Sequence, residues 1–171
     1  VNLEYFDDWK NDPQFLADTL EMLDNVLSHF IKHAPDTISR ARFSAERERS
    51  VGLGALGFHA YLQRNNIPFE GPIAKGVNHK IFSHIRQQLD VKNKELAIER
   101  GEAPDAEGFG VRLSHVMSVA PNASTSIILG NTSPSVEPWR ANCYRQDTLS
   151  GAFLNKNKYL DQLLKDKCKE D

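Results

Sequence analysis

The chain has 171 residues, of which 40% are hydrophobic and 26% are charged, and this is the composition of an ordinary globular protein. The length is sufficient for one domain with a hydrophobic core. The formal net charge of -2 gives no general attraction to nucleic acid or to an anionic membrane. No apolar run approaches the roughly 20 residues that would span a bilayer. We therefore expect a cytoplasmic protein that has no membrane partner and no direct nucleic-acid partner.

Hydrophobic periodicity predicts three long helices in the first half of the chain. The first begins at Pro13, where the missing N–H costs little, and its apolar stripe continues to Ile31. The second is expected from about Ser44 to Asn65. The third is expected from about Lys75 to Glu99, and Gly101 is a natural stop after it.

The second half changes in character and predicts short strands and loops. A strand is expected from His115 to Ala120, and a second short strand at Ser135 to Pro138. The tail from about Asn155 to Lys167 is expected to be an exposed basic helix. Two or three strands cannot form a complete parallel sheet with covered faces. We therefore expect residues 1–171 to be a single fragment of a larger α/β domain. Because the chain begins with Val1 rather than methionine, we expect it to start inside a longer reading frame.

A literal G-x-G-x-x-G motif stands at Gly52-Leu53-Gly54-Ala55-Leu56-Gly57. In a dinucleotide-binding domain this motif follows a strand, whereas here the charged and helical run Ala45 to Ser50 precedes it. Three glycines in a helix interior lower the stability of the helix by about 3 kcal/mol relative to three alanines. Their presence therefore needs an explanation in tertiary packing. We interpret the three glycines as residues that leave part of a helix surface without side chains, so that another element packs closely against it.

Neither the histidines nor the cysteines predict a metal site. His29 and His33 are one helical turn apart, but no third ligand is evident and the H-E-x-x-H pattern is absent. The two cysteines, Cys143 and Cys168, are too few for a disulfide scaffold and do not form a C-x-x-C pair. Free thiols are the default expectation for both.

The segment Pro121-Asn122-Ala123-Ser124-Thr125-Ser126 is the most informative in local chemistry. Small side chains allow backbone N–H groups to approach an anion, and the start of the following helix adds its positive dipole end. The segment lacks the Gly-Lys pair of a P-loop, so it would hold a phosphate through amides and hydroxyls. An ordinary serine-threonine cap of a surface helix explains the composition equally well.

Three longer stretches together resemble one family. They are Ser118 to Ser126 continued by Gly130 to Pro138, Arg47 to Phe58, and Arg140 to Gly151. The chain resembles the C-terminal half of the barrel in the large subunit of class I ribonucleotide reductases. The Pro-Asn-Ala-Ser-Thr-Ser run is most similar to phage and bacterial forms, which would place the protein in a bacterium or a phage-infected host cell.

The resemblance implies a fold and an activity. The family folds as a ten-stranded α/β barrel with outer helices, and this chain would supply a helix-rich half followed by short strands and loops. The family reduces ribonucleoside diphosphates to deoxyribonucleoside diphosphates by radical chemistry. The substrate diphosphate would rest on Pro121, Asn122, Ala123, Ser124 and Thr125, with Ser126 at the edge of the match.

The resemblance also implies what this chain lacks. The radical cysteine and the first member of the redox pair would lie upstream of Val1, and the tyrosine relay and C-terminal cysteines beyond Asp171. No catalytic residue and no metal ligand is therefore expected here, and the isolated chain is expected to be inactive. The complete enzyme would depend on a radical from a metal-containing small subunit and on a dithiol reductant such as thioredoxin or glutaredoxin. Asn122 and Ala123 replace a serine and a glutamate of some relatives, which removes a side-chain contact.

Three hypotheses remain open on the sequence. The chain is part of a reductase large subunit that is split, truncated or excerpted, with the remainder of the subunit as its partner. Alternatively it is a binding module that retains the phosphate loop without chemistry. A dinucleotide-dependent oxidoreductase depends on the glycine motif alone, and the missing strand before Gly52 argues against it.

Overall fold

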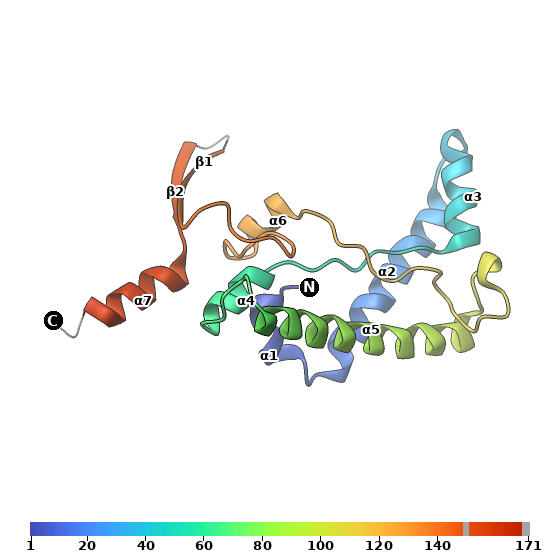
Figure 1. Ribbon diagram of the computed structural model, residues 1–171. Coiled ribbons are helices and arrows are strands. Elements are labelled where there is room, and N and C mark those ends of the chain that lie inside the picture. Colours follow the sequence, from blue (N-terminus) through green and yellow to red (C-terminus); the bar gives the residue numbers. More distant parts are fainter. Residues whose placement is uncertain (149–150, 169–171) are drawn as a thin grey trace. The chain divides into compact units, whose positions relative to one another are not determined.

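The computed structural model describes residues 1–148 and 151–168, which are mainly helical (Figure 1). The two longest helices are α2 (Pro13–His33) and α5 (Pro72–Arg100). The one sheet within the described residues is an antiparallel hairpin of β1 (Cys143–Thr148) and β2 (Gly151–Lys156). The shorter helical elements are η1 (Leu3–Tyr5), α1 (Phe6–Trp9), η2 (Asp36–Ile38), α3 (Ser39–Glu48), α4 (Phe58–Arg64), η3 (Pro104–Ala106), α6 (Ala123–Ile128) and α7 (Lys158–Cys168).

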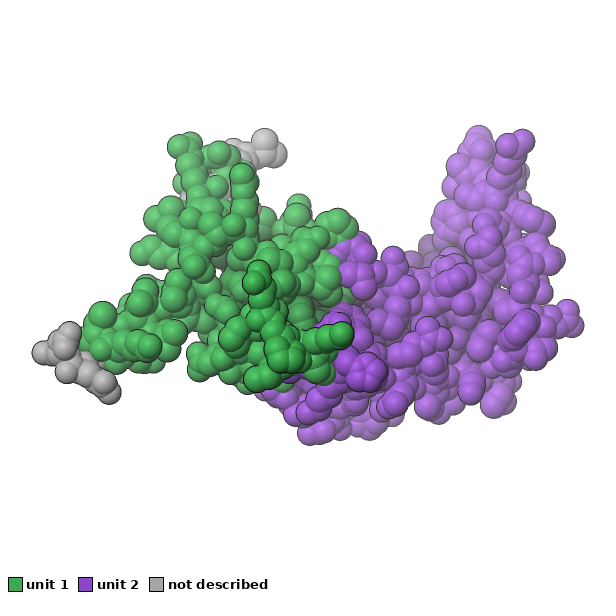
Figure 2. Space-filling view, viewed as in Figure 1, with its two compact units in different colours: residues 1–5, 55–76, 121–171 green, residues 6–54, 77–120 purple. Residues whose placement is uncertain are grey.

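The chain forms two compact units, which Figure 2 distinguishes by colour. Unit 1 consists of residues 1–5, 55–76 and 121–171, and unit 2 consists of residues 6–54 and 77–120. Unit 1 is therefore assembled from three separate parts of the sequence. It contains the segment 121–126 that the sequence analysis selected, so the site is described within this unit.

Two of the predicted helices are confirmed. Helix α2 begins where the sequence indicates, since the Asp12 carboxylate accepts a hydrogen bond of 2.9 Å from the Gln14 N–H and Pro13 occupies the first turn. Helix α5 contains the predicted range and extends it by one turn at the start. Its buried side chains recur at helical spacing, namely Ile81, Ile85, Leu89 and Leu96.

A buried carboxylate connects three segments of unit 2. Asp24 is fully buried in α2 and lies 2.5 Å from Arg49, 2.9 Å from Arg100 and 3.2 Å from Arg112. Burial alone would raise the pKa of Asp24, but the hydrogen bonds from Arg49 and Arg100 and the charge of Arg112 hold it below its usual value. Loss of one partner from such a network leaves an uncompensated charge, at a cost of about 3–5 kcal/mol.

The predicted helix over 44–65 is wrong in its middle part. Helix α3 ends at Glu48, α4 begins at Phe58, and the residues between them are not helical. Val51 and Leu53 donate their N–H groups to the carbonyls of His115 and Val116 at 3.0 and 2.9 Å. The glycine segment therefore pairs with a distant stretch of backbone in place of its own helix. The predicted close approach is confirmed, because a Cβ on Gly52 would lie 2.6 Å from the Ser118 Cβ.

The predicted strands are confirmed only in part. The 115–120 segment forms one parallel bridge, between Leu53 and Met117. Residues 135–138 are not a strand, because Ser135 has a left-handed φ of 44° and the Glu137 N–H closes a turn onto Pro134. The β1–β2 hairpin was not predicted, although its first strand lies within the third stretch of family resemblance. Leu149 and Ser150 of that stretch lie outside the described residues.

The predicted tail helix is confirmed as α7, which has no buried residue and carries lysines in its last turn. It is attached to unit 1 at its first turn. The buried Glu4 carboxylate lies 2.5 Å from both the Lys158 Nζ and the Tyr159 hydroxyl. Burial would raise the pKa of Glu4, but the hydrogen bonds from Lys158 and Tyr159 lower it. Burial and the hydrogen bond to Glu4 raise the pKa of Tyr159, which therefore stays a donor.

Two glycine substitutions are expected to have opposite effects on the free energy of unfolding. Gly52→Ala places a methyl group against the Ser118 Cβ, which cannot move without its backbone, and should destabilise the protein by about 1–3 kcal/mol. Gly76→Ala lies in α5 with no atom within 4 Å of the new Cβ, and should stabilise the helix by about 1 kcal/mol. Urea unfolding of both variants measures the difference. Equal effects of the two substitutions would contradict the close approach at Gly52.

Candidate functional site

The segment 121–126 forms a turn into the short helix α6. Asn122 occupies the N-cap position with a left-handed φ of 52°, a conformation that asparagine tolerates better than most residues. Its side chain does not cap the helix, since the Nδ2 donates a hydrogen bond of 3.2 Å to the Ala55 carbonyl. The side chain that normally satisfies the first N–H groups of a helix is thus used to anchor the turn to residue 55.

This arrangement leaves the first turn of α6 open. The first intrahelical bond runs from the Ser126 N–H to the Asn122 carbonyl at 2.9 Å. Within the described residues, the backbone N–H groups of Ala123, Ser124 and Thr125 have no hydrogen-bond partner. The Ser124 and Thr125 side chains are exposed beside them. Unpaired N–H groups with adjacent hydroxyls favour an anion.

The predicted site residues do not all face the same way. Ser126 is only 4% exposed, and its hydroxyl donates to the Ala123 carbonyl at 2.8 Å. It therefore belongs to the internal structure of α6. Pro121 is exposed and Asn122 is half-buried, so the exposed donors are concentrated at Ala123, Ser124 and Thr125.

The far end of α6 is anchored to the start of α4. The Thr132 N–H donates to the Ser126 carbonyl at 3.0 Å. The next residue, Ser133, accepts the Gly57 N–H at its carbonyl at 2.8 Å and the Ala60 N–H at its hydroxyl at 3.0 Å. A Cβ on Gly57 would lie 2.9 Å from the Thr132 Oγ1, so only glycine permits this approach.

A cavity of about 380 Å³ opens beside α6, within the range typical of small-molecule sites. Its walls combine apolar, aromatic and charged side chains from α6, the following loop and β1: Ala123, Ile127, Pro134, Trp139, Arg140, Tyr144, Arg145 and Asp147. Arg145 forms an ion pair of 2.8 Å with Asp147. No hydrogen bond or ion pair to the side chains of Arg140 or Tyr144 is found within residues 1–148 and 151–168. The cavity thus contains one uncompensated cation.

The loop that carries Trp139 is fixed by a buried histidine. His59 in α4 is 9% exposed, and its Nδ1 accepts the Trp139 N–H at 3.1 Å. The Trp139 ring packs edge-on against the His59 ring, with the centroids 5.2 Å apart. Because Nδ1 accepts a hydrogen bond, the ring is neutral with its proton on Nε2. Burial lowers the pKa of His59, which favours the same neutral form.

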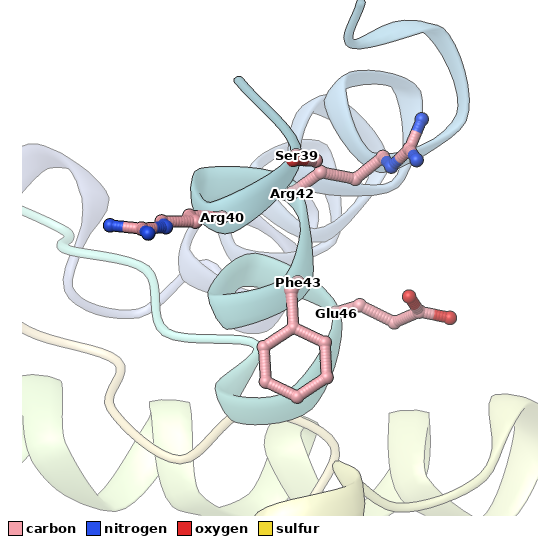
Figure 3. Close-up of a pocket in the computed structure, with 5 residues that line it drawn as sticks. All are labelled: Ser39, Arg40, Arg42, Phe43 and Glu46. Atoms are coloured by element: carbon pink, nitrogen blue, oxygen red, sulfur yellow. The ribbon is translucent and has the colours of Figure 1, made fainter. Parts of the chain in front are cut away.

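The remaining surface features do not converge on a ligand. A second hollow of about 420 Å³ on α3 is lined by Ser39, Arg40, Arg42, Phe43 and Glu46. Figure 3 shows that the Arg40 and Arg42 side chains point away from one another, so they do not form one anion site. Arg42 also pairs with Asp36 at 3.2 Å.

The histidine pair and the cysteines are ordinary surface features. His33 Nδ1 is bonded to the His29 carbonyl at 2.9 Å. Cys143 and Cys168 are exposed free thiols. Across the described ranges, no three histidine, cysteine or carboxylate side chains are grouped closely enough to hold a metal ion. Among the same residues, no helix combines the length and apolar character needed to cross a membrane.

The sequence analysis did not select Arg140, Trp139, Tyr144 or His59. Arg140 and Tyr144 lie in the third stretch of family resemblance, which assigned no role to any residue there. An arginine between a tryptophan and an alanine carries no motif of its own. Only the folded arrangement, which brings residues 123 and 140 to one cavity, distinguishes it.

Comparisons with known proteins identify the fold. The profile of the family described as "Ribonucleotide reductase, barrel domain" matches residues 1–109 and 103–171. Among solved structures, the Actinobacillus ureae class Id ribonucleotide reductase alpha subunit superposes with a TM-score of 0.86 at 39% identity, covering 97% of this chain and 30% of that one. The fold is thus part of that α/β barrel, as the sequence analysis expected.

Viral relatives give the same assignment. The ribonucleoside-diphosphate reductase large subunit of Invertebrate iridescent virus 6 is 57% identical over 96% of this chain and 17% of its own length. A putative large subunit of Frog virus 3 is 44% identical over 94% of this chain and 28% of its own length. The chain belongs to the ribonucleotide reductase barrel-domain family. It spans less than a third of the length of these relatives, so it corresponds to a piece of their large subunit.

The buried His59 predicts a dependence of stability on pH. Its folded pKa lies below the unfolded value of 6.5, so the unfolded chain takes up the proton first as the pH falls. The contribution of neutral His59 to the free energy of unfolding is therefore fully present above pH 6.5. It is lost as the pH falls from 6.5 through the folded pKa. In His59→Asn the Oδ1 still accepts the Trp139 N–H but does not titrate. Between pH 8 and pH 5, the urea unfolding midpoint should fall less steeply in this variant than in the unsubstituted chain. The variant is expected to be less stable at pH 8, because the packing of the imidazole ring is lost. Parallel curves would exclude His59 as the titrating group.

Proposed function

We propose that the chain is part of the large subunit of a ribonucleoside-diphosphate reductase and that it supplies the substrate-phosphate loop and part of the barrel wall. The observation that carries the proposal is the match over nearly the whole chain to large-subunit relatives, one of them 57% identical. The relatives' names specify ribonucleoside diphosphates as the compounds acted on. The unpaired N–H groups of Ala123, Ser124 and Thr125 support a diphosphate site at the loop.

The proposal assigns this chain a binding role in a radical reaction. Its loop would hold the diphosphate through backbone amides and the Ser124 and Thr125 hydroxyls, which fixes the nucleotide for chemistry performed by the rest of the subunit. We propose that the complete enzyme receives its radical from a metal-containing small subunit and its electrons from a dithiol reductant such as thioredoxin or glutaredoxin. A cytoplasmic location, where both substrate and reductant occur, belongs to the same proposal.

A charge placed at the loop tests the phosphate site. Ser124→Asp puts a carboxylate in the first turn of α6, where it stabilises the helix but repels a phosphate. We expect the Kd for a ribonucleoside diphosphate to rise by about tenfold or more, equivalent to about 1.4 kcal/mol, with no loss of thermal stability. Ser124→Asn matches the aspartate in shape, lacks its charge and replaces the hydroxyl donor with an amide N–H donor, so its Kd is expected to stay within about threefold of that of the unsubstituted chain. Calorimetric titration measures both. Equal affinities in all three proteins would remove the loop from the binding site.

Reconstitution tests the enzymatic role. The chain alone should give no deoxyribonucleotide, whereas the chain mixed with the upstream part of a related large subunit, a small subunit and a dithiol reductant should give measurable product. Ser124→Asp in the same mixture should lower product formation, and Ser124→Asn should not. Association without product, together with diphosphate binding by the chain alone, would favour a binding module without chemistry.

A further inference from the structure

The phosphate loop has donors but no full positive charge of its own. The residues from Pro121 to Ser126 contain no lysine or arginine. The start of a helix is equivalent to roughly +0.5 charge, while a nucleoside diphosphate carries more than one full negative charge. Amides and hydroxyls alone therefore leave part of the phosphate charge uncompensated.

The adjoining cavity contains the missing cation. Arg140 and Ala123 line the same cavity of about 380 Å³, and Ala123 is the first residue of α6. Of the two arginines in this cavity, Arg145 is paired with Asp147 at 2.8 Å, while the Arg140 side chain has no partner within the described residues. The net charge of these three side chains is +1, and Arg140 supplies it.

The backbone that carries Arg140 is held in place from two directions. The preceding residue, Trp139, donates its N–H to His59 Nδ1 at 3.1 Å, and its ring contacts both His59 and Tyr159. The turn before it is closed by the Glu137 N–H to the Pro134 carbonyl at 3.1 Å. An arginine on such a fixed segment loses less conformational freedom on binding than one on a free loop.

The chemistry of the cavity matches a phosphate ligand. A guanidinium binds phosphate through paired N–H donors, and its strength depends on the absence of a competing carboxylate. Tyr144 also lines the cavity, and its hydroxyl, which has no partner within the described residues, can serve as a further donor. Ile127 and Pro134 add apolar side chains to the wall, and Arg140 is exposed, so its guanidinium is accessible to a ligand from solvent.

We propose that Arg140 is a substrate-binding residue whose guanidinium pairs with the phosphate groups of the nucleoside diphosphate, with the Tyr144 hydroxyl as an additional donor. Trp139 and His59 are positioning residues that hold this arginine at the cavity. The inference depends on the proposed function, because it adds a side-chain cation to the phosphate site at Ala123, Ser124 and Thr125.

The test compares nucleotides that differ by one phosphate. The 171-residue chain and its variants are titrated with a ribonucleoside diphosphate and with the matching monophosphate. Arg140→Gln should weaken diphosphate binding by about tenfold or more, because a charge-assisted pair is lost. It should also reduce the preference for diphosphate over monophosphate, and Arg140→Lys should recover part of that preference. Arg40→Gln removes the same charge from an exposed and unpaired arginine of α3, and should leave both affinities unchanged.

Each outcome has a definite meaning. An unchanged diphosphate preference in Arg140→Gln, while Ser124→Asp still weakens diphosphate binding, overturns the assignment of Arg140 and leaves the proposed function intact. An equal loss for both nucleotides, accompanied by a lower unfolding midpoint, shows a structural role only and also overturns the assignment. Absence of diphosphate binding in the unsubstituted chain removes the proposed phosphate site itself, and the Arg140 assignment with it.

Discussion

Three parts of the chain that are far apart in the sequence meet at Gly57. A side chain there would collide with the Asn2 Oδ1 at 2.5 Å and with the Thr132 Oγ1 at 2.9 Å, and the backbone adopts a φ of 84°. The Gly57 N–H also binds the Ser133 carbonyl. The start of the chain, the entry to α4 and the segment that follows α6 are therefore connected through one residue without a side chain. The orientation of the candidate phosphate loop depends on this contact, because Thr132 carries the end of α6.

Among the described residues two carboxylates are buried, and each connects separate segments within its own unit. Asp24 in unit 2 gathers three arginines around one fully buried side chain. Glu4 in unit 1 holds the first turn of α7 through Lys158 and Tyr159. In both cases the cost of burying the charge is offset by charged or hydrogen-bonding partners that lie far from the carboxylate in the sequence. These carboxylates thus specify which segments assemble, in addition to contributing to stability.

The two longest helices could be predicted from the sequence, but the contacts between distant segments could not. The apolar stripes of α2 and α5 recur every three or four residues and are bounded by proline, so local physics determines them. The Gly52 segment follows a helical spacing at Leu53 and Leu56, yet its N–H groups bond to residues more than sixty positions later. Nothing in the local sequence reveals that these long-range hydrogen bonds replace the hydrogen bonds of a helix. The segment 121–126 could be selected as a candidate phosphate loop because its small and hydroxyl residues are contiguous, and this remains a prediction. Arg140 could not be selected, because only the folded chain brings it to a cavity shared with α6.

The position of Glu4 has a consequence for the order in which the protein forms during its synthesis. Its partner Tyr159 follows it by 155 residues. At about 5 to 20 residues per second, a ribosome needs roughly 8 to 30 seconds to produce that interval. A helix forms within about a microsecond, so the formation of α2 and α5 is not limited by the time needed to synthesise the partners of Glu4. The attachment of the first turn of α7 to unit 1 can therefore form only after Tyr159 has been synthesised, well after the residues of both long helices.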